Sequence, residues 1–194
     1  LDVQTTKKKE TIKKRVERIS NMKKEMGDMR RLASRSTRRV REAVKYAENA
    51  SQGLGGGAKL QLARIFPNID ASDEAGLSSA FKSLALDELQ KFKGPTTDFE
   101  FGITEDIVGS LTNGQSANKA RLASLERANW FINREAEQFD AYQKAGHDPD
   151  KFAFNIDEMI TPKKGGPSYT LRDLQDTAVA NHISIDEVIK RLSK

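Results

Sequence analysis

The 194-residue chain contains no cysteine, which excludes disulfide bonds, thiol catalysis and thiolate metal sites. No window approaches 18 apolar residues, so no single helix is expected to span a membrane. Only 37% of the residues are hydrophobic, and few large apolar side chains occur in the first quarter. The length therefore predicts one or two domains with a modest core after residue 58. The chain begins with Leu1 rather than Met, as a processed product or a fragment would.

Charge is distributed unevenly along the chain. Residues 7–45 hold sixteen Lys and Arg against five Asp and Glu, a local charge of +11. Since the whole chain carries +5, the remainder carries −6. A basic segment joined to an acidic body indicates that the segment contacts a polyanion or the acidic surface of a neighbouring copy.

The basic segment, residues 1–52, is predicted to be one long coiled-coil-like helix with a narrow contact stripe. From Ile12 a heptad pattern runs unbroken to Ala50, and all of its inward positions but Arg15 are apolar or small. Such a helix over residues 7–50 would be a rod of about 66 Å, with Gly27 as the weak point. Small residues after position 33 predict close packing in a bundle or between copies. The predicted oligomerisation residues are Ile12, Ile19, Met22, Met26, Met29, Ala33, Val40, Ala43 and Ala47.

Cations repeat every seven residues on the opposite face of this helix, with further arginines beside them. A solvated outer face is one interpretation. However, acids four residues away are nearly absent, and uncompensated like charges destabilise a helix, so phosphate, anionic lipid headgroups or an acidic subunit would offset them. No aromatic residue interrupts the stripe, which favours sequence-independent contact with the backbone of double-stranded DNA. The predicted nucleic-acid-binding residues are Lys24, Arg30, Arg31, Arg35, Arg38, Arg39, Arg41 and Lys45.

The rest of the chain predicts an all-α fold in several segments. The glycine-rich residues 53–57 are predicted to be a hinge rather than a phosphate loop, because they follow a helix and no Lys-Ser or Lys-Thr comes after them. Residues 58–146 are predicted to form a helical body, whose longest helix is capped by Ser116. A loop or linker is expected over residues 147–169, and a C-terminal helical hairpin over residues 170–194.

No catalytic or cofactor site is predicted, and the chain is not expected to be an enzyme. His147, Asp148 and Asp150 lie close together in sequence, but a helix cap is the favoured role over a metal site. The C-terminal hairpin has the outline of a helix-turn-helix. Its second helix opens with Asp186 and Glu187, which would repel DNA, so packing or partner docking is favoured.

One stretch of the body resembles a known family. Residues 91–98 read Lys-Phe-Lys-Gly-Pro-Thr-Thr-Asp, residues 112–114 form a Thr-Asn-Gly turn, and residues 117–119, Ala-Asn-Lys, open a long helix. This arrangement resembles the DNA ejection, or DNA transfer, proteins of tailed-bacteriophage virions over roughly residues 85–155. The Asp-Pro-x-x-Phe at residues 148–152 and the hairpin at residues 171–192 are in keeping with it.

The resemblance implies a structural virion protein that is released with the genome and assembles as a ring or tube through which DNA passes. It implies as partners copies of the chain, DNA, other virion or ejection proteins and the host envelope, and a location in the virion and later in the host periplasm or envelope. Two alternatives remain open from the sequence. One is a non-viral, nucleic-acid-associated coiled-coil protein, and the other is a portal or tail adaptor of the virion.

Overall fold

The computed structural model describes residues 2–65, 68–89 and 109–194, with the backbone alone for residues 2–10 and 89. The chain is 73% helical with almost no strand, which confirms the predicted all-α class with a long N-terminal helix and a C-terminal helix pair. Residues 91–98, which carry part of the family resemblance, lie outside the described residues. The elements are α1 (Asp2–Asn49), α2 (Leu54–Ile65), α3 (Ser72–Leu89), α5 (Gln115–Lys144), η1 (Pro149–Lys151), β1 (Met159–Ile160), β2 (Tyr169–Thr170), α6 (Leu171–Ala180) and α7 (Ile185–Leu192).

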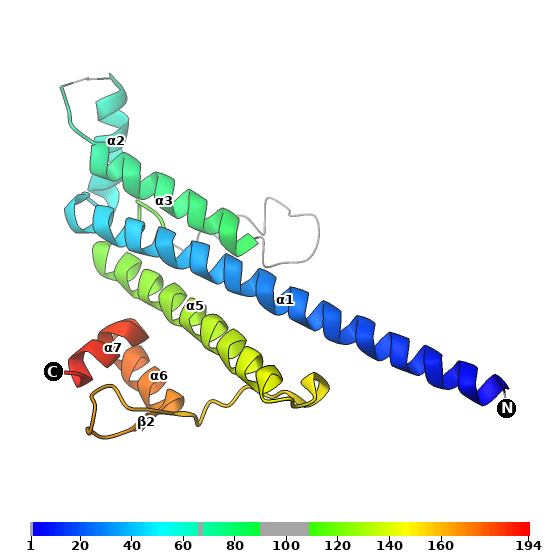
Figure 1. Cartoon of the computed structure of the whole chain (residues 1–194). Helices are drawn as coiled ribbons and strands as arrows, with labels where there is room; N and C mark the ends of the chain where they lie inside the picture. The colour runs from blue at the N-terminus through cyan, green and yellow to red at the C-terminus, as the bar shows by residue number, and fades with distance from the viewer. Residues whose placement is uncertain (1, 66–67, 90–108) are drawn as a thin grey trace.

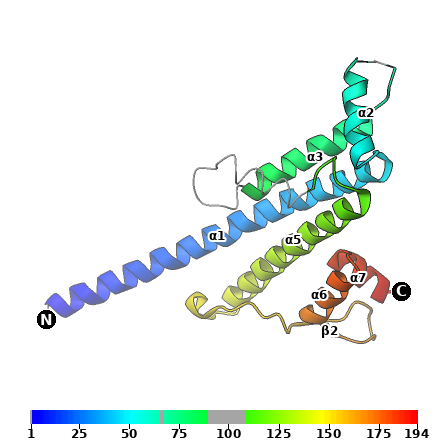
Figure 2. The same ribbon diagram turned by 180° about the vertical axis from the view of Figure 1, so that it is seen from behind.

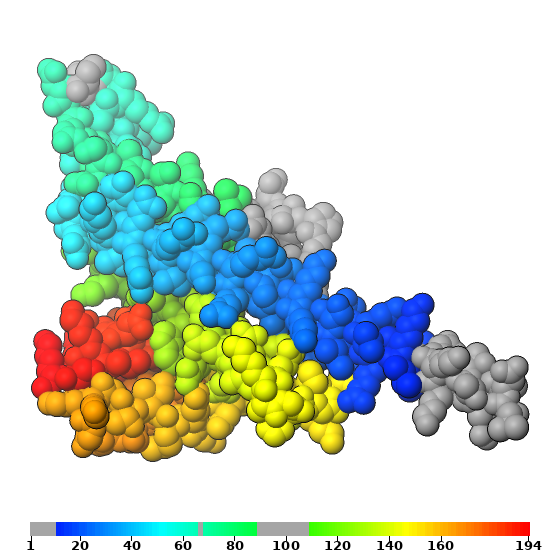
Figure 3. Space-filling view, in the orientation of Figure 1, coloured from blue at the N-terminus to red at the C-terminus, as the bar shows by residue number. Residues whose placement is uncertain are grey.

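The fold is built around α1, which lies between α3 and α5 (Figure 1). Both partners run antiparallel to α1. Ser36 lies beside Asn129 of α5, and Arg39 beside Ser83 of α3. The 48 residues of α1 span about 72 Å, whereas α3 has 18 residues and α5 has 30. The N-terminal part of α1, residues 2–19, therefore extends beyond both partners and is here called the arm (Figures 1 and 3).

The predicted heptad stripe of α1 is the face that the chain buries in its own core. Ala33, Val40 and Ala43 are fully buried, and Val40 and Ala43 pack in one cluster with Leu84 of α3 and Leu122 of α5. The oligomerisation role predicted for these three residues is therefore wrong, because this chain's own helices already occupy the space around them. Ala47, also in that set, packs partly buried against the same cluster.

A polar pair fixes the register between α1 and α5. Ser36 is the polar member of the buried part of the stripe, and it is fully buried. Its hydroxyl accepts a hydrogen bond from the side-chain amide of Asn129 at 2.9 Å and donates one to Glu88 at 3.3 Å. Because a buried polar group is costly without its partner, this pair favours one alignment of the two helices.

The glycine-rich segment after α1 is not a hinge, which corrects the prediction for residues 53–57. Leu54 to Gly57 form the first turn of α2. Gly53 adopts a left-handed φ of 77°, and its N–H donates to the carbonyl groups of Leu111 and Asn113. A Cβ at Gly56 would lie 2.0 Å from the carbonyl oxygen of Ser51, so α2 can start close to the end of α1 only with glycine there.

The C-terminal hairpin packs as a small separate cluster on α5. Trp130 and Phe131 of α5 contact a core formed by Leu174, Ala178, Ile185 and Val188. At the start of α6, Thr170 and Asp173 make both hydrogen bonds of a capping box, and Ser184 accepts from the N–H of Glu187 at the start of α7. The chain turns between the helices at His182, which has a φ of 53°.

Two local expectations differ from the structure. The N-cap of α5 is Gly114, with no side-chain cap bond, so Ser116 does not cap the helix. Residues 147–169 contain the η1 turn and the strand β1, which pairs antiparallel with β2 through Met159 with Thr170 and Ile160 with Tyr169. This short ribbon brings the chain back to α6, so the segment is a structured connection.

A substitution at Gly27 tests the intrinsic stability of the long helix α1. The α1 helix continues through Gly27 without interruption, and a Cβ at this position would meet nothing within 4 Å. Gly27→Ala is therefore expected to raise the free energy of unfolding by about 0.5–1 kcal/mol, because alanine restricts the unfolded chain and favours the helix. Urea denaturation followed by circular dichroism measures this change, and a loss of stability would contradict the helix seen here.

Candidate nucleic-acid interface

Four of the eight predicted nucleic-acid-binding residues form an exposed row on α1, here called the outward stripe. They are spaced by seven residues and lie opposite the buried heptad stripe: Lys24, Arg31, Arg38 and Lys45. The side chain of Arg31 is 81% exposed and pairs with Asp28 of the same helix. No ion pair joins the other three to an acid among the described residues. An exposed pair such as Arg31 with Asp28 contributes little, so all four cations are accessible to an anion.

Two of the remaining predicted residues, Arg35 and Arg39, bind a buried carboxylate of α3. Asp87 has a side chain that is 2% exposed, and it lies 2.9 Å from a guanidinium nitrogen of each arginine. Arg39 also donates to the backbone carbonyl group of Ser83. These two arginines neutralise a buried charge inside the molecule, a structural role that the sequence did not predict.

The last two predicted residues, Arg30 and Arg41, lie on the other side of α1. Arg30 pairs with Asp140 of α5 at 3.3 Å. Arg41 pairs with Asp186 of α7 at 3.4 Å and with Glu126 of α5 at 3.8 Å. Burial raises the pKa of Glu126, the charge of Asp186 adds to the rise, and Arg41 opposes it. Both arginines thus attach α1 to the body, although their side chains remain about half exposed or more.

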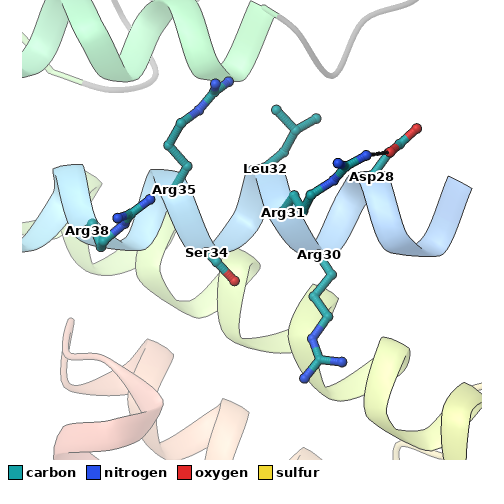
Figure 4. Close-up of a pocket in the computed structure, with 7 residues that line it drawn as sticks. All are labelled: Asp28, Arg30, Arg31, Leu32, Ser34, Arg35 and Arg38. Atoms are coloured by element: carbon teal, nitrogen blue, oxygen red, sulfur yellow. Dashed lines mark hydrogen bonds and ion pairs between the residues drawn. The ribbon is translucent and has the colours of Figure 1, made fainter. Parts of the chain in front are cut away.

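An open hollow of about 870 Å³ runs along this part of α1 (Figure 4). Arg35 points towards α3 and Arg30 towards α5, whereas Arg31 reaches back along α1 to Asp28 (Figure 4). The side chains of Arg35 and Arg30 therefore extend from two different sides of α1. The outward stripe lies on the face between these two sides. The lining residues are Asp28, Arg30, Arg31, Leu32, Ser34, Arg35 and Arg38.

The arm of α1 is held to the body by a carboxylate pair beyond the end of α5. Arg15, the charged member of the heptad pattern, lies 2.6 Å from Asp148 and 3.4 Å from Asp150, and Arg18 also pairs with Asp150. Asp148 in addition caps η1 by accepting from the N–H of Asp150. Among the described residues no group of three or more His, Cys, Asp or Glu is arranged to hold a metal ion.

This contact gives the arm a measurable pH dependence. The hydrogen bond from Arg15 lowers the pKa of the Asp148 carboxyl group below its ordinary value. The stabilisation is therefore present above the ordinary carboxyl pKa and is lost as the pH falls through the lowered value. In Arg15→Gln, the pKa of Asp148 is expected to rise towards that of a free aspartate, as measured by NMR titration of its carboxyl carbon. An unchanged titration would contradict the contact.

The other predicted oligomerisation residues lie on the arm and the segment that follows it. Ile12 is 55% exposed, and Ile19, Met22, Met26 and Met29 are partly buried. Val16, which the heptad pattern does not include, is 61% exposed. The predicted stripe is thus buried or partly buried from Ala33 onwards, whereas the residues before Ala33 are exposed or only partly buried.

Sequence reasoning missed the acidic partners of α1. Asp87, Asp140 and Asp186 lie more than 40 positions from the arginines that they bind, so no local spacing could reveal them. Only Arg15 indicated an acidic partner, because a cation in an otherwise apolar stripe predicts an acid nearby. Its partners are Asp148 and Asp150.

The arrangement can bind an extended anion along one helix. Four accessible cations in a row match the repeated negative charge of a phosphate backbone. Within the described part of the chain, no helix is long and apolar enough to cross a membrane. Comparison of the chain with protein-family models, with curated protein sequences and with solved structures finds no significant match.

Proposed function

We propose that this chain is a structural protein of a tailed-phage particle that acts in genome ejection, assembling in several copies that contact or conduct double-stranded DNA. The observation that carries the proposal is the outward stripe, four accessible cations that the body's own acids leave available. The resemblance around residues 85–155 adds the virion context. The partners proposed are copies of the chain, the DNA backbone and other virion proteins, with release into the host periplasm or envelope.

The shape of the molecule supports a role along DNA. A rigid helix of about 72 Å carries the stripe on one face and is held on its other sides by α3 and α5. The stripe from Lys24 to Lys45 spans about 32 Å, so it can lie along about one turn of B-DNA without rearrangement. Copies placed side by side around an axis would then present parallel rows of positive charge to one DNA molecule.

Negative-stain microscopy of the purified chain, with and without linear double-stranded DNA of random sequence, tests the assembly. Rings, tubes or regularly coated DNA are the expected result. Free monomers beside bare DNA at low salt would contradict the proposal. Adding unrelated DNA sequences as competitors should displace the complex equally, because phosphate contacts carry no sequence information.

A non-viral DNA-associated protein is the second candidate, and one observation favours it. Much of the predicted oligomerisation stripe is buried within the chain itself, as a monomer or dimer would require. A protein that coats DNA only as monomers or dimers, without rings or tubes, would support this candidate. A gene located away from portal and tail genes would support it too, whereas neighbouring portal and tail genes would favour the virion roles, including a portal or tail adaptor.

A further inference from the structure

A pocket of about 320 Å³ lies between α1 and α5, on one flank of the outward stripe. The two helices lie side by side in both views (Figures 1 and 2). Each helix contributes side chains spaced by three or four residues, so the contributors share one face of their helix. The lining residues are Arg30, Ser34, Trp130, Asn133, Arg134 and Glu137.

This pocket adjoins the open hollow that runs along α1. Arg30 and Ser34 line both cavities. Their side chains point from α1 towards α5, whereas Arg31 of the outward stripe reaches along α1 (Figure 4). A strand whose phosphates lie on the outward stripe would therefore have this pocket beside it.

Trp130 supplies an aromatic ring next to the basic helix, from a distant part of the sequence. The ring packs edge-on against Phe131, with 5.3 Å between the ring centroids, and contacts the core of the C-terminal hairpin. These contacts hold the ring in place at the wall of the pocket. Tryptophan rings stack with any nucleobase, because every base has a flat π-face.

The charges around the pocket favour a neutral ligand. Arg30 pairs with Asp140 at 3.3 Å, and Arg134 binds Glu137 at 2.9 Å and Glu158 at 2.8 Å. Since both guanidinium groups are already neutralised, a phosphate group gains little by entering. A cationic ligand would meet two guanidinium groups and one carboxylate in the lining. A neutral ring avoids both costs, and a guanidinium plane offers it a further stacking surface.

Asn133 provides a polar group that can bind the edge of a base. Its side-chain carbonyl accepts a hydrogen bond from the hydroxyl of Ser34 at 3.4 Å, which is long for such a bond. Among the described residues, no other hydrogen bond of the Asn133 side chain is found. A side-chain amide offers a donor and an acceptor, as the edges of nucleobases do. The pocket thus suits a flat, neutral and polar heterocycle.

We propose that this pocket binds one unpaired nucleobase of a DNA strand whose phosphates lie on the outward stripe. Trp130 stacks on the base, and Asn133 hydrogen-bonds to its edge. A base inside a duplex is paired and stacked, so it cannot enter without leaving the helix. The inference rests on the proposed function and adds that the chain prefers DNA with unpaired bases to fully paired DNA.

Tryptophan fluorescence tests the pocket directly, because Trp130 is the only tryptophan of the chain. Two single-stranded probes of equal charge are compared: a thymidine oligomer of about ten nucleotides and an abasic sugar-phosphate oligomer of the same length. The thymidine oligomer is expected to quench the fluorescence and to bind about tenfold more tightly. The abasic oligomer and a blunt-ended duplex should bind to the outward stripe without quenching.

A variant of the pocket and a matched control locate the effect. Asn133→Leu removes the amide without changing the net charge. Its affinity for the thymidine oligomer is expected to fall by about fivefold, with unchanged affinity for the abasic oligomer. Asn49→Leu replaces an exposed asparagine of α1 outside the pocket and should bind both oligomers like the wild type. Circular dichroism confirms that each variant is folded.

The outcomes separate this inference from the proposed function. Equal affinity for the two oligomers, or equal quenching by both, would overturn the inference while duplex binding still supports the proposed function. Equal losses in Asn133→Leu and Asn49→Leu would also overturn it. Quenching by the thymidine oligomer without any binding of duplex DNA would support the pocket and contradict the proposed function. Failure of every probe to bind would contradict both.

Discussion

Affinity for double-stranded DNA is expected to fall by about a hundredfold or more at low salt when the outward stripe is neutralised, in the quadruple variant Lys24→Gln, Arg31→Gln, Arg38→Gln and Lys45→Gln. Each cation that contacts a phosphate releases counterions from DNA. Loss of four contacts should therefore make the plot of log affinity against log salt shallower by about 3 to 4. Fluorescence anisotropy over a salt series measures both quantities.

A control variant with the same change of net charge shows whether position matters. Four exposed lysines of the body pair with no acid among the described residues, and they are replaced together: Lys119→Gln, Lys144→Gln, Lys151→Gln and Lys164→Gln. This variant is expected to keep most of the wild-type affinity and salt dependence. Equal losses in the two variants would mean that only net charge attracts DNA, and the stripe would have no special role.

The double variant Arg35→Gln with Arg39→Gln is expected to have a lower free energy of unfolding, whether or not its affinity for DNA also falls. Both guanidinium groups lie 2.9 Å from Asp87, whose side chain is 2% exposed. Removing them leaves a buried carboxylate without compensation, which costs about 3–5 kcal/mol in comparable cases. Urea denaturation should show the loss directly.

Arg31→Gln with Arg38→Gln is the matched control for this loss. It removes two arginines from the same helix, but neither binds a described acid of another element. Its free energy of unfolding is expected to stay within about 0.5 kcal/mol of the wild type. Equal stability of both double variants would show that the contact between Asp87 and α1 does not form.

The heptad pattern of α1 predicted which face would be buried, but it could not identify the partner. Ala33, Val40 and Ala43 face inward as expected. Small residues permit close approach by any helix, from the same chain or from another copy. In this chain the partners are α3 and α5, which follow later in the sequence, and the choice depends on their own apolar faces meeting α1 after folding.

The eight cations predicted to bind nucleic acid lie in two different settings in the structure, and their role in binding DNA stays a prediction. The seven-residue repeat identified Lys24, Arg31, Arg38 and Lys45, all of which are exposed. The arginines beside the repeat point to the flanks of the helix, where α3 and α5 supply acids. These acids lie in distant parts of the chain. The sequence near α1 therefore did not show that several of its arginines pair with acidic side chains.

Glycine residues misled the prediction for a different reason. Glycine-rich sequence is typical of flexible linkers. Here, however, Gly56 lies so close to Ser51 that any side chain would clash with the Ser51 backbone. The need for close approach between α1 and α2 is a tertiary feature. Nothing local in residues 53–57 distinguishes it from a hinge.

Lysine footprinting on the DNA complex tests the central claim most directly. The chain is acetylated with and without double-stranded DNA at low salt, and the modification of each lysine is read by mass spectrometry. The account predicts strong protection of Lys24 and Lys45 and unchanged modification of Lys119, Lys144, Lys151 and Lys164. Unprotected Lys24 and Lys45 beside protected body lysines would place DNA on another surface and contradict the account.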